Sequence, residues 1–350
     1  MTDEDAIEHA LSAVDPGIRG HVLLRRNGRP FMALPADRDT AIHAINLYQP
    51  QRPKAVLAMV VIRLLVITGF HRMSLPKLHG IGGKLALDPE FAGCLPGTAG
   101  VMLGSPEHRV RRALLSYKTD QGWEVAKLAF GHEGRTVIDG EYAALSNMPS
   151  TSPGIPQALG VHHGEEFSIL RLPYIHGHPL PPRQGTRGLD LLESWIRDLP
   201  ARPAGDFSEW PAIESALETS KEGKRALARL AEMQLRPVIR HGDFARWNLL
   251  RQNDGSLMVV DWEWGHPMGM PGLDLVHFFL QDVRLVKRLP PAAAIAASIR
   301  ELQGPTCAGY FEKTGWTGDA LLPVIASLAW KQGAKQQDNV DVLEAALRMG

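Results

Sequence analysis

The chain has 350 residues, of which 44% are hydrophobic and 22% charged, as expected for a folded protein with a substantial core. A chain of this length suggests about two domains. Lys plus Arg and Asp plus Glu each number 38, so no net field would recruit nucleic acid or an anionic membrane.

Two further features of the sequence limit the class of protein. The cysteines Cys94 and Cys307 lie far apart and have no neighbouring CxxC motif or His-Cys cluster, which indicates neither a disulfide framework nor a zinc site. The acidic N-terminus lacks the pattern of a secretory signal or a transit peptide. We therefore predict a cytoplasmic protein.

Residues 1–95 are predicted to form a small α+β extension. Ala6 to Val14 has helical spacing, His21 to Leu34 is typical of two strands joined by a turn, and Pro53 to Phe70 predicts a long apolar helix. The apolar run is short for a bilayer span, which needs roughly 20 residues, and Arg63 lies near its middle. A buried helix is favoured over a membrane-associated one, and no membrane span is expected.

A glycine-rich stretch then separates this extension from the rest of the chain. Gly80 to Lys84 has some likeness to a phosphate-binding loop, but Leu78 and Leu85 replace the glycine and the hydroxyl residue that such a loop requires. A linker and a domain boundary near residue 95 are therefore predicted.

Residues 96–176 are predicted to form a second, strand-rich domain. Lys127 stands alone within an apolar strand, and a helix is expected to open at Glu141 after a turn at Asp139-Gly140. The predicted strands are Val101–Leu103, Val110–Tyr117, Trp123–Phe130, Pro156–His163 and Phe167–Leu172.

Residues 177–350 are mostly helical in pattern, but a polar stretch from His241 to Leu250 interrupts two apolar runs. A hairpin is predicted directly after it. Asp243, Asn248 and Asp261 would lie at neighbouring strand ends, where their oxygens can bind a cation and a hydroxyl group together. The alternative is that these are ordinary turn residues.

The spacing His241-x-Asp243-x-x-x-x-Asn248, followed by Asp261, resembles the aminoglycoside phosphotransferase and choline kinase family. The resemblance implies an α+β, bilobal protein-kinase-like fold, with a small antiparallel β lobe at 96–176 and a helical lobe at 177–350. It also implies an enzyme that transfers phosphate from ATP, with Mg²⁺, to a hydroxyl group of a small molecule. The cofactor and the partners would thus be Mg²⁺, ATP and a small acceptor.

The resemblance assigns roles within the large lobe. Asp243 would position the attacking hydroxyl, His241 would brace the loop, and Asn248 and Asp261 would hold Mg²⁺. Arg246 would either stabilise the transferring phosphoryl group or anchor the loop, and the sequence leaves both interpretations open.

The resemblance also assigns nucleotide contacts in and near the small lobe. Lys127 would clamp phosphates while paired with Glu141. The turn after the first strand of this lobe takes the place of a phosphate-covering loop, although it has one glycine rather than three, and a hinge after the last strand would bind adenine. The predicted residues are Lys127, Glu141, Gly104, Ser105, Pro173 and Ile175.

After Asp261 comes the pattern Gly269-x-Pro271-x-x-Asp274, which resembles the segment that follows the metal aspartate in this family. Asp274 would accept backbone N–H bonds from the catalytic loop, cap the following helix, or do both. Only 13 residues separate Asp261 from Asp274, without an Ala-Pro-Glu motif, so a small acceptor is favoured over a peptide.

Two other functions remain open from the sequence. One is a nucleotide-binding interaction protein that no longer catalyses, with residues 1–95 as its docking module. The other is a kinase that acts on a protein or a glycan through that extension. The acceptor, the choice between ATP and GTP and the oligomeric state are not determined by the sequence.

Overall fold

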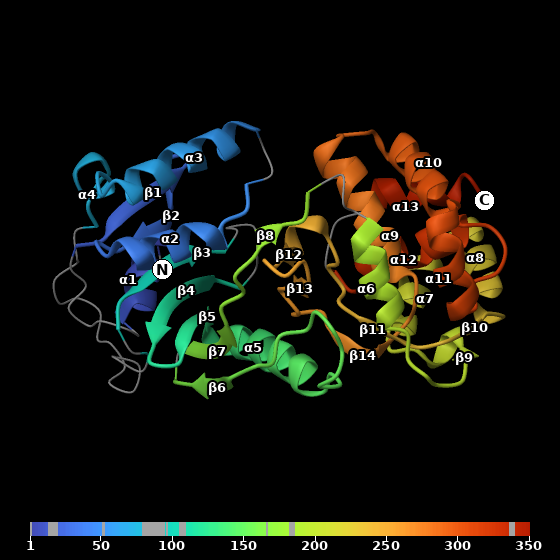
Figure 1. The fold of residues 1–350 in the computed structure, drawn as a ribbon. Coiled ribbons are helices and arrows are strands. Elements are labelled where there is room, and N and C mark those ends of the chain that lie inside the picture. Colours follow the sequence, from blue (N-terminus) through green and yellow to red (C-terminus); the bar gives the residue numbers. More distant parts are fainter. Residues whose placement is uncertain are drawn as a thin grey trace. The chain divides into compact units, whose positions relative to one another are not determined.

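A computed structural model describes residues 2–12, 20–50, 53–78, 95, 97–104, 110–165, 167–181, 186–335 and 340–350. The chain divides into two compact units (Figure 1). Unit 1 contains residues 1–146 and 157–174, and unit 2 contains residues 147–156 and 175–350.

Unit 1 is built on a seven-stranded antiparallel sheet in the order β1-β2-β3-β4-β5-β7-β6. The predicted strands are confirmed with small shifts at their ends, except that the strand expected at Pro156–His163 is formed only from Gly160 onward. The strands are β1 Val22–Arg26, β2 Arg29–Leu34, β3 Ala99–Leu103, β4 Arg112–Thr119, β5 Gly122–Phe130, β6 Gly160–His163 and β7 Phe167–Pro173. The helices are α1 Asp3–Ser12, α2 Arg38–Leu47, α3 Pro53–Ile67, α4 His71–Ser74 and α5 Gly131–Ser146.

The first 95 residues share this sheet with the strands that follow. β2 pairs with β3 through Met32 opposite Met102 and Ala33 opposite Val101, so backbone hydrogen bonds cross the expected boundary. The compact units therefore do not follow the predicted division near residue 95. The stretch Gly80–Lys84 lies outside the described residues.

Helix α3 packs on the sheet with only one side, so the prediction of a buried helix is wrong for most of its surface. Met59 and Val66 are buried in a cluster with strands β1 and β2 and helix α2. On the other side, Leu57 is 67% and Leu64 57% exposed. A helix that is apolar all round has no polar stripe to mark its solvent side, so its sequence pattern does not distinguish the two sides.

Helix α5 begins earlier than the sequence indicated. It runs from Gly131 to Ser146, and Asp139 and Gly140 are helical rather than a turn. Gly134 permits this early start, because a Cβ at this position would lie 2.8 Å from the backbone carbon of Ala129. Glu141 is consequently held in the middle of a helix rather than at its first turn.

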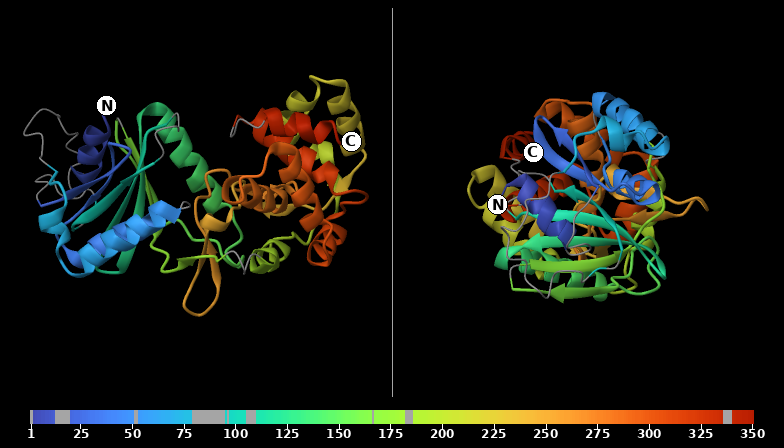
Figure 2. Two further views of the ribbon diagram at one scale, coloured as in Figure 1. Left: turned by 90° about the horizontal axis from the view of Figure 1, so that it is seen from above. Right: turned by 90° about the vertical axis from the view of Figure 1, so that its left-hand side faces the viewer.

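Unit 2 is mainly helical, which agrees with the predicted helical lobe (Figures 1 and 2). Helix α12 lies at its centre, and every residue from Leu321 to Lys331 is buried. Its helices are α6 Thr186–Ser194, α7 Trp210–Leu217, α8 Lys221–Ala231, α9 Leu273–Gln281, α10 Pro291–Leu302, α11 Pro305–Thr314, α12 Leu321–Gly333 and α13 Val340–Leu347. Shorter turns are the 3-10 helices η2 Ala204–Asp206 and η3 Arg246–Asn248 and the π-helix η4 Asp282–Val286.

Short strands in unit 2 carry the polar stretch identified in the sequence. They form pairs β9–β10 and β11–β14 and a three-stranded sheet β13-β12-β8. Their bounds are β8 His178–Pro179, β9 Arg202–Pro203, β10 Gln234–Leu235, β11 Val238–Arg240, β12 Leu249–Arg251, β13 Leu257–Val259 and β14 His266–Gly269. Within the described ranges, no helix has the length and apolar character needed to cross a membrane.

Two glycines of α5 give a matched test of its packing. Gly134→Ala places a Cβ against Ala129, so we expect a loss of about 1–3 kcal/mol in the free energy of unfolding. Gly140→Ala meets nothing within 4 Å, so the better helix propensity of alanine should add about 0.5–1 kcal/mol. Urea unfolding of both variants measures the difference, and equal effects would contradict the close approach at Gly134.

Candidate active site

The segment from His241 to Asn248 connects β11 to β12 and ends in the turn η3. β12 and β13 form the predicted hairpin, with Leu249 opposite Val259. The N–H of Val260 donates to the carbonyl of Asn248 at 2.9 Å. This register brings the backbone of Asn248 beside the residue that precedes Asp261.

Asp274, in the first turn of α9, holds the start of this segment. Its two carboxylate oxygens accept the backbone N–H groups of His241 at 2.6 Å and of Gly242 at 2.8 Å. The expected contact with the catalytic loop is therefore confirmed, while the residue at the N-cap of α9 is Gly272. Gly242 has a φ of +87°, and a Cβ there would lie 2.4 Å from the Cβ of Trp264, so the bend requires glycine.

His241 is fully buried and serves as a brace. Its Nε2 must donate to the carbonyl of Val260 at 3.0 Å, because a carbonyl can only accept, and its Nδ1 accepts the N–H of Asp243 at 3.1 Å. The second contact requires a neutral ring, because a protonated Nδ1 could not accept a hydrogen bond. Burial lowers the pKa of His241, in agreement with that tautomer.

Asp243 is surrounded by groups that the sequence analysis did not predict. Its Oδ1 accepts the Nε2–H of His277 at 2.8 Å and lies 3.8 Å from the ammonium of Lys331. Lys331 also donates to the carbonyl of Gly242. The Nδ2 of Asn248 donates to the backbone carbonyl of Asp243 at 2.8 Å and to its Oδ2 at 3.1 Å.

Burial opposes ionisation of Asp243, but the hydrogen bond from His277 and the nearby charges outweigh it and lower the pKa of this carboxyl. Burial also lowers the pKa values of His277 and of Lys331. The carboxylate is thus ionised at neutral pH, and its Oδ1 is already oriented by a buried donor.

Asn248 and Asp261 are the predicted ligands of Mg²⁺, and each carries a side-chain oxygen. The amide nitrogen of Asn248 donates to Asp243, so its amide oxygen is the atom that would bind a metal. Asp261 directly follows Val260 with a φ of +73°, a conformation that costs energy in a residue other than glycine. A carboxylate and an amide oxygen fit Mg²⁺. In the described parts of the chain, no cluster of three His, Cys, Asp or Glu side chains is preformed for a metal.

Arg246 begins the turn η3 and forms an ion pair with Asp282 of η4 at 3.1 Å. Its side chain is only 14% exposed. This contact supports the interpretation that Arg246 anchors the loop. A role at the phosphoryl group stays a prediction.

In unit 1, Lys127 on β5 and Glu141 on α5 form the expected pair. The Lys127 ammonium donates to the two carboxylate oxygens at 2.7 and 2.9 Å, and the side chains are 14% and 2% exposed. Successive side chains of a strand point to opposite faces of the sheet, so Lys127 lies on the face opposite the buried Ala126 and Leu128. This is the face on which it meets Glu141 of α5.

The other predicted nucleotide residues are only partly described. The N–H of Gly104 donates to the carbonyl of Arg112 at 3.0 Å, directly beyond the last paired residues of β3 and β4, while Ser105 lies outside the described residues. Pro173 ends β7 opposite Glu124, and Ile175 comes two residues later. Their contacts with adenine stay predictions.

Comparison with known proteins supports the chemistry suggested by this geometry. Residues 167–310 match the profile of the phosphotransferase enzyme family. The likeness to that family thus covers 144 of the 350 residues. The match includes the catalytic loop, Asp261 and Asp274, and it confirms the predicted class of enzyme, a phosphotransferase with an alcohol group as acceptor. No curated protein matches the chain significantly.

Solved structures similar to this phosphotransferase are distant. A thermostable mutant of aminoglycoside phosphotransferase APH(4)-Ia is 14% identical, with a TM-score of 0.47 over 73% of this chain and 96% of that one. APH(3'')-Id from Streptomyces rimosus is 14% identical, with a TM-score of 0.42 over 67% and 92%. Ethanolamine kinase from Plasmodium vivax is 11% identical, with a TM-score of 0.42 over 71% and 80%.

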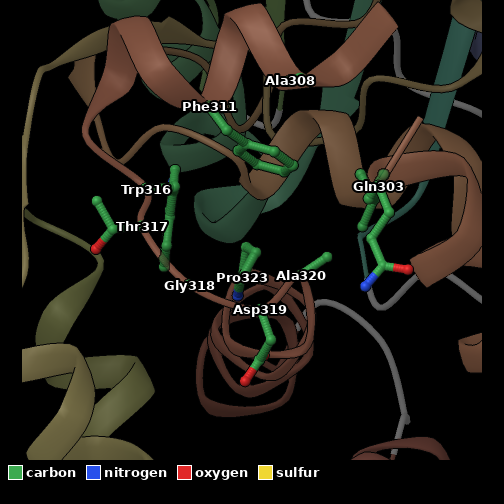
Figure 3. A pocket seen from close by; sticks show the side chains of 10 residues that line it. Gln303, Ala308, Phe311, Trp316, Thr317, Gly318, Asp319, Ala320 and Pro323 are labelled. Carbon is green, nitrogen blue, oxygen red and sulfur yellow. The ribbon is translucent and has the colours of Figure 1, made fainter. Parts of the chain in front are cut away.

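A pocket of about 260 Å³ in unit 2 is separate from the residues considered so far (Figure 3). Its lining includes Phe311, Trp316 and Asp319 but none of the catalytic-loop residues of the phosphotransferase. Asp319 pairs with Arg229 at 3.1 Å and accepts the N–H of Leu321. Because its one carboxylate is committed to structural contacts, we assign no chemistry to this pocket.

The buried histidines of the phosphotransferase predict a pH-dependent stability. The pKa values of His241 and His277 are lowered, so the unfolded chain binds protons below about pH 6.5 that the folded chain does not bind. The free energy of unfolding should therefore fall as the pH decreases from 7 to 5, by up to about 1.4 kcal/mol per pH unit for each histidine. Asp243, whose pKa is also lowered, should contribute only below about pH 4.

Urea unfolding followed by tryptophan fluorescence measures this slope in unit 2, because Trp123 is the one tryptophan of the eight that lies in unit 1. His277→Asn keeps a donor toward Asp243 and should reduce the slope. His132→Asn, at an exposed position, is the control and should leave it unchanged. A slope that His277→Asn does not alter would exclude a neutral His277 in the folded state.

Proposed function

We propose that this chain transfers the γ-phosphate of ATP to a hydroxyl group of a small molecule, with Mg²⁺ as the metal ion. The observation that carries the proposal is the fixed carboxylate of Asp243, which is bonded by His277 on one oxygen and by Asn248 on the other. A carboxylate held in this way can accept the hydrogen of an incoming hydroxyl group and orient its oxygen for attack.

The first role of Asp243 in this proposal is to position the hydroxyl group of the acceptor, before any proton is transferred. Because its pKa is lowered, it is a weak base toward an unreacted alcohol. Proton transfer therefore follows the formation of the new phosphorus–oxygen bond, when the hydroxyl has become acidic. This order agrees with the loose transition state that most analyses assign to phosphoryl transfer.

His277 and Lys331 are positioning residues for Asp243. His277 comes from α9 and Lys331 from α12, two buried helices, so both donors have fixed places. The Lys331 ammonium also bonds the carbonyl of Gly242 and thereby links α12 to the loop. Together they fix the direction of the carboxylate and keep it ionised.

Asn248 and Asp261 are the proposed ligands of Mg²⁺, which would neutralise charge on the phosphate oxygens. Asn248 has two tasks in this scheme. Its amide nitrogen restrains Asp243, and its amide oxygen would be the atom that holds the metal. The positive φ of Asp261 is the local strain that sets the direction of the second ligand.

Lys127 is the proposed phosphate-binding residue of unit 1. A lysine is a flexible point charge, and the bidentate contact with buried Glu141 removes much of that freedom. Gly104, Ser105, Pro173 and Ile175 complete the proposed nucleotide contacts. The short segment between Asp261 and Asp274 forms β14 and pairs with β11, which supports a small acceptor over a peptide platform.

The proposal is tested with purified protein, ATP and Mg²⁺ against a panel of sugars, amino alcohols, nucleosides and aminoglycosides. We expect ADP release that one class of acceptor stimulates. Asp243→Asn should retain ATP binding and lower turnover by on the order of 10²–10⁴. Full turnover in this variant would remove Asp243 from the mechanism, and no stimulated release with any acceptor would count against a small-molecule kinase.

A change at Lys331 tests the positioning role. Lys331→Met removes the positive charge 3.8 Å from Asp243 while keeping a long apolar stem, so the pKa of Asp243 should rise. The acid limb of the pH profile of kcat should then move to higher pH, with little change in KM for ATP. Lys287→Met, at an exposed position, is the control, and an unshifted acid limb in Lys331→Met would contradict the role.

A further inference from the structure

Helix α3 has an apolar side that the sheet does not cover. Met59 and Val66 pack into the core of unit 1, whereas six aliphatic side chains on the other side are between 40% and 67% exposed. These residues define the α3 surface, which consists of Val56, Leu57, Val60, Val61, Leu64 and Ile67. Monomeric proteins rarely expose so continuous an apolar strip, and such strips usually mark an interaction site.

Basic residues border the α3 surface on both sides. At about 100° per residue, Lys54 falls beside Val61 on one edge, and Arg63 falls beside Val56 and Ile67 on the other. Both are exposed, and Arg63 also donates to Asn46 of α2. An apolar face with cationic residues along its edges is typical of a helix that lies in the plane of a lipid surface.

The charge of the surrounding sequence is strongly one-sided although the whole chain is neutral. Residues 40–87 contain six Lys or Arg residues and no Asp or Glu. Just beyond α3, Phe70 is 56% and Met73 is 83% exposed, with the exposed Arg72 between them. Apolar and cationic groups are thus interleaved, and this stretch of sequence has no carboxylate of its own; Asp37, just before it, interacts with the charge of Arg72.

We propose that the α3 surface docks unit 1 on an anionic membrane surface, with the aliphatic side chains at the level of the lipid headgroups and Lys54 and Arg63 on the phosphates. A second copy of the chain fits less well. A two-fold interface would bring the same patch against itself, so cationic edges would face each other with no acidic residue to pair with. One face of a 15-residue helix is also smaller than the roughly 20–30 residues that each partner usually contributes.

The test is sedimentation of the full chain with vesicles. Binding should be clear on phosphatidylcholine vesicles that contain about 30% phosphatidylserine, weak on pure phosphatidylcholine, and reduced by salt. Leu57→Glu with Val61→Glu should lower the partition coefficient by at least about tenfold. The matched control is Leu159→Glu with Leu199→Glu, which adds the same charge at exposed leucines outside the α3 surface and should leave binding unchanged.

A second pair of variants separates charge from apolar contact. Lys54→Gln with Arg63→Gln should remove most of the preference for anionic vesicles, while Lys287→Gln with Arg300→Gln should not. Circular dichroism verifies that the variants are folded. Absence of vesicle binding by the unmodified chain, or equal binding by the Leu57→Glu, Val61→Glu variant, would overturn the proposal. So would a dimer, seen by light scattering, that this variant dissociates.

Discussion

The structure of the catalytic loop depends on the contact between one carboxylate and two backbone N–H groups. Asp274 accepts from His241 and Gly242 at the point where β11 ends. Hydrogen bonds to a charged group each contribute about 1.5–3 kcal/mol, and Asp274 is only 4% exposed, so water cannot replace them. This clamp sets the bend at Gly242 and therefore the direction in which Asp243 leaves the backbone.

Several buried charged groups lie close to the carboxylate of Asp274. Asp243 and Asp274 lie close to the buried ammonium of Lys331, and the N–H groups at the start of α9 add positive potential near Asp274. His277 contributes a donor without a charge. Lys331 on α12 thus lies beside both carboxylates, which offsets part of the cost of placing two acidic side chains in a mostly apolar unit.

Part of this site was predicted from the sequence. The hairpin after the loop from His241 to Asn248 follows from short-range pattern and turn chemistry, whereas the contact of Asp274 with the loop was expected from the resemblance to a kinase family. Lys127 and Glu141 were also predicted as a pair, although the start of α5 was misplaced because its glycines suggested a turn.

The contacts that were missed depend on tertiary packing. His277 lies 34 residues from Asp243, and Lys331 lies 89 residues from Gly242, so no spacing rule connects them. Each is a polar residue in a mostly apolar helix, which is the one signal the sequence offered. The exposed side of α3 was missed for the opposite reason, since all its residues look like core.

The pairing of β2 with β3 has a consequence for how this chain can be divided. A shortened form that starts after residue 95 would leave β3 as the border of the sheet, with its N–H and C=O groups open to pairing with other molecules. It would also strip away α1 and so uncover the apolar side of β4 and β5. The N-terminal residues are therefore an integral part of unit 1, and removing them would produce an aggregation-prone fragment rather than a minimal enzyme.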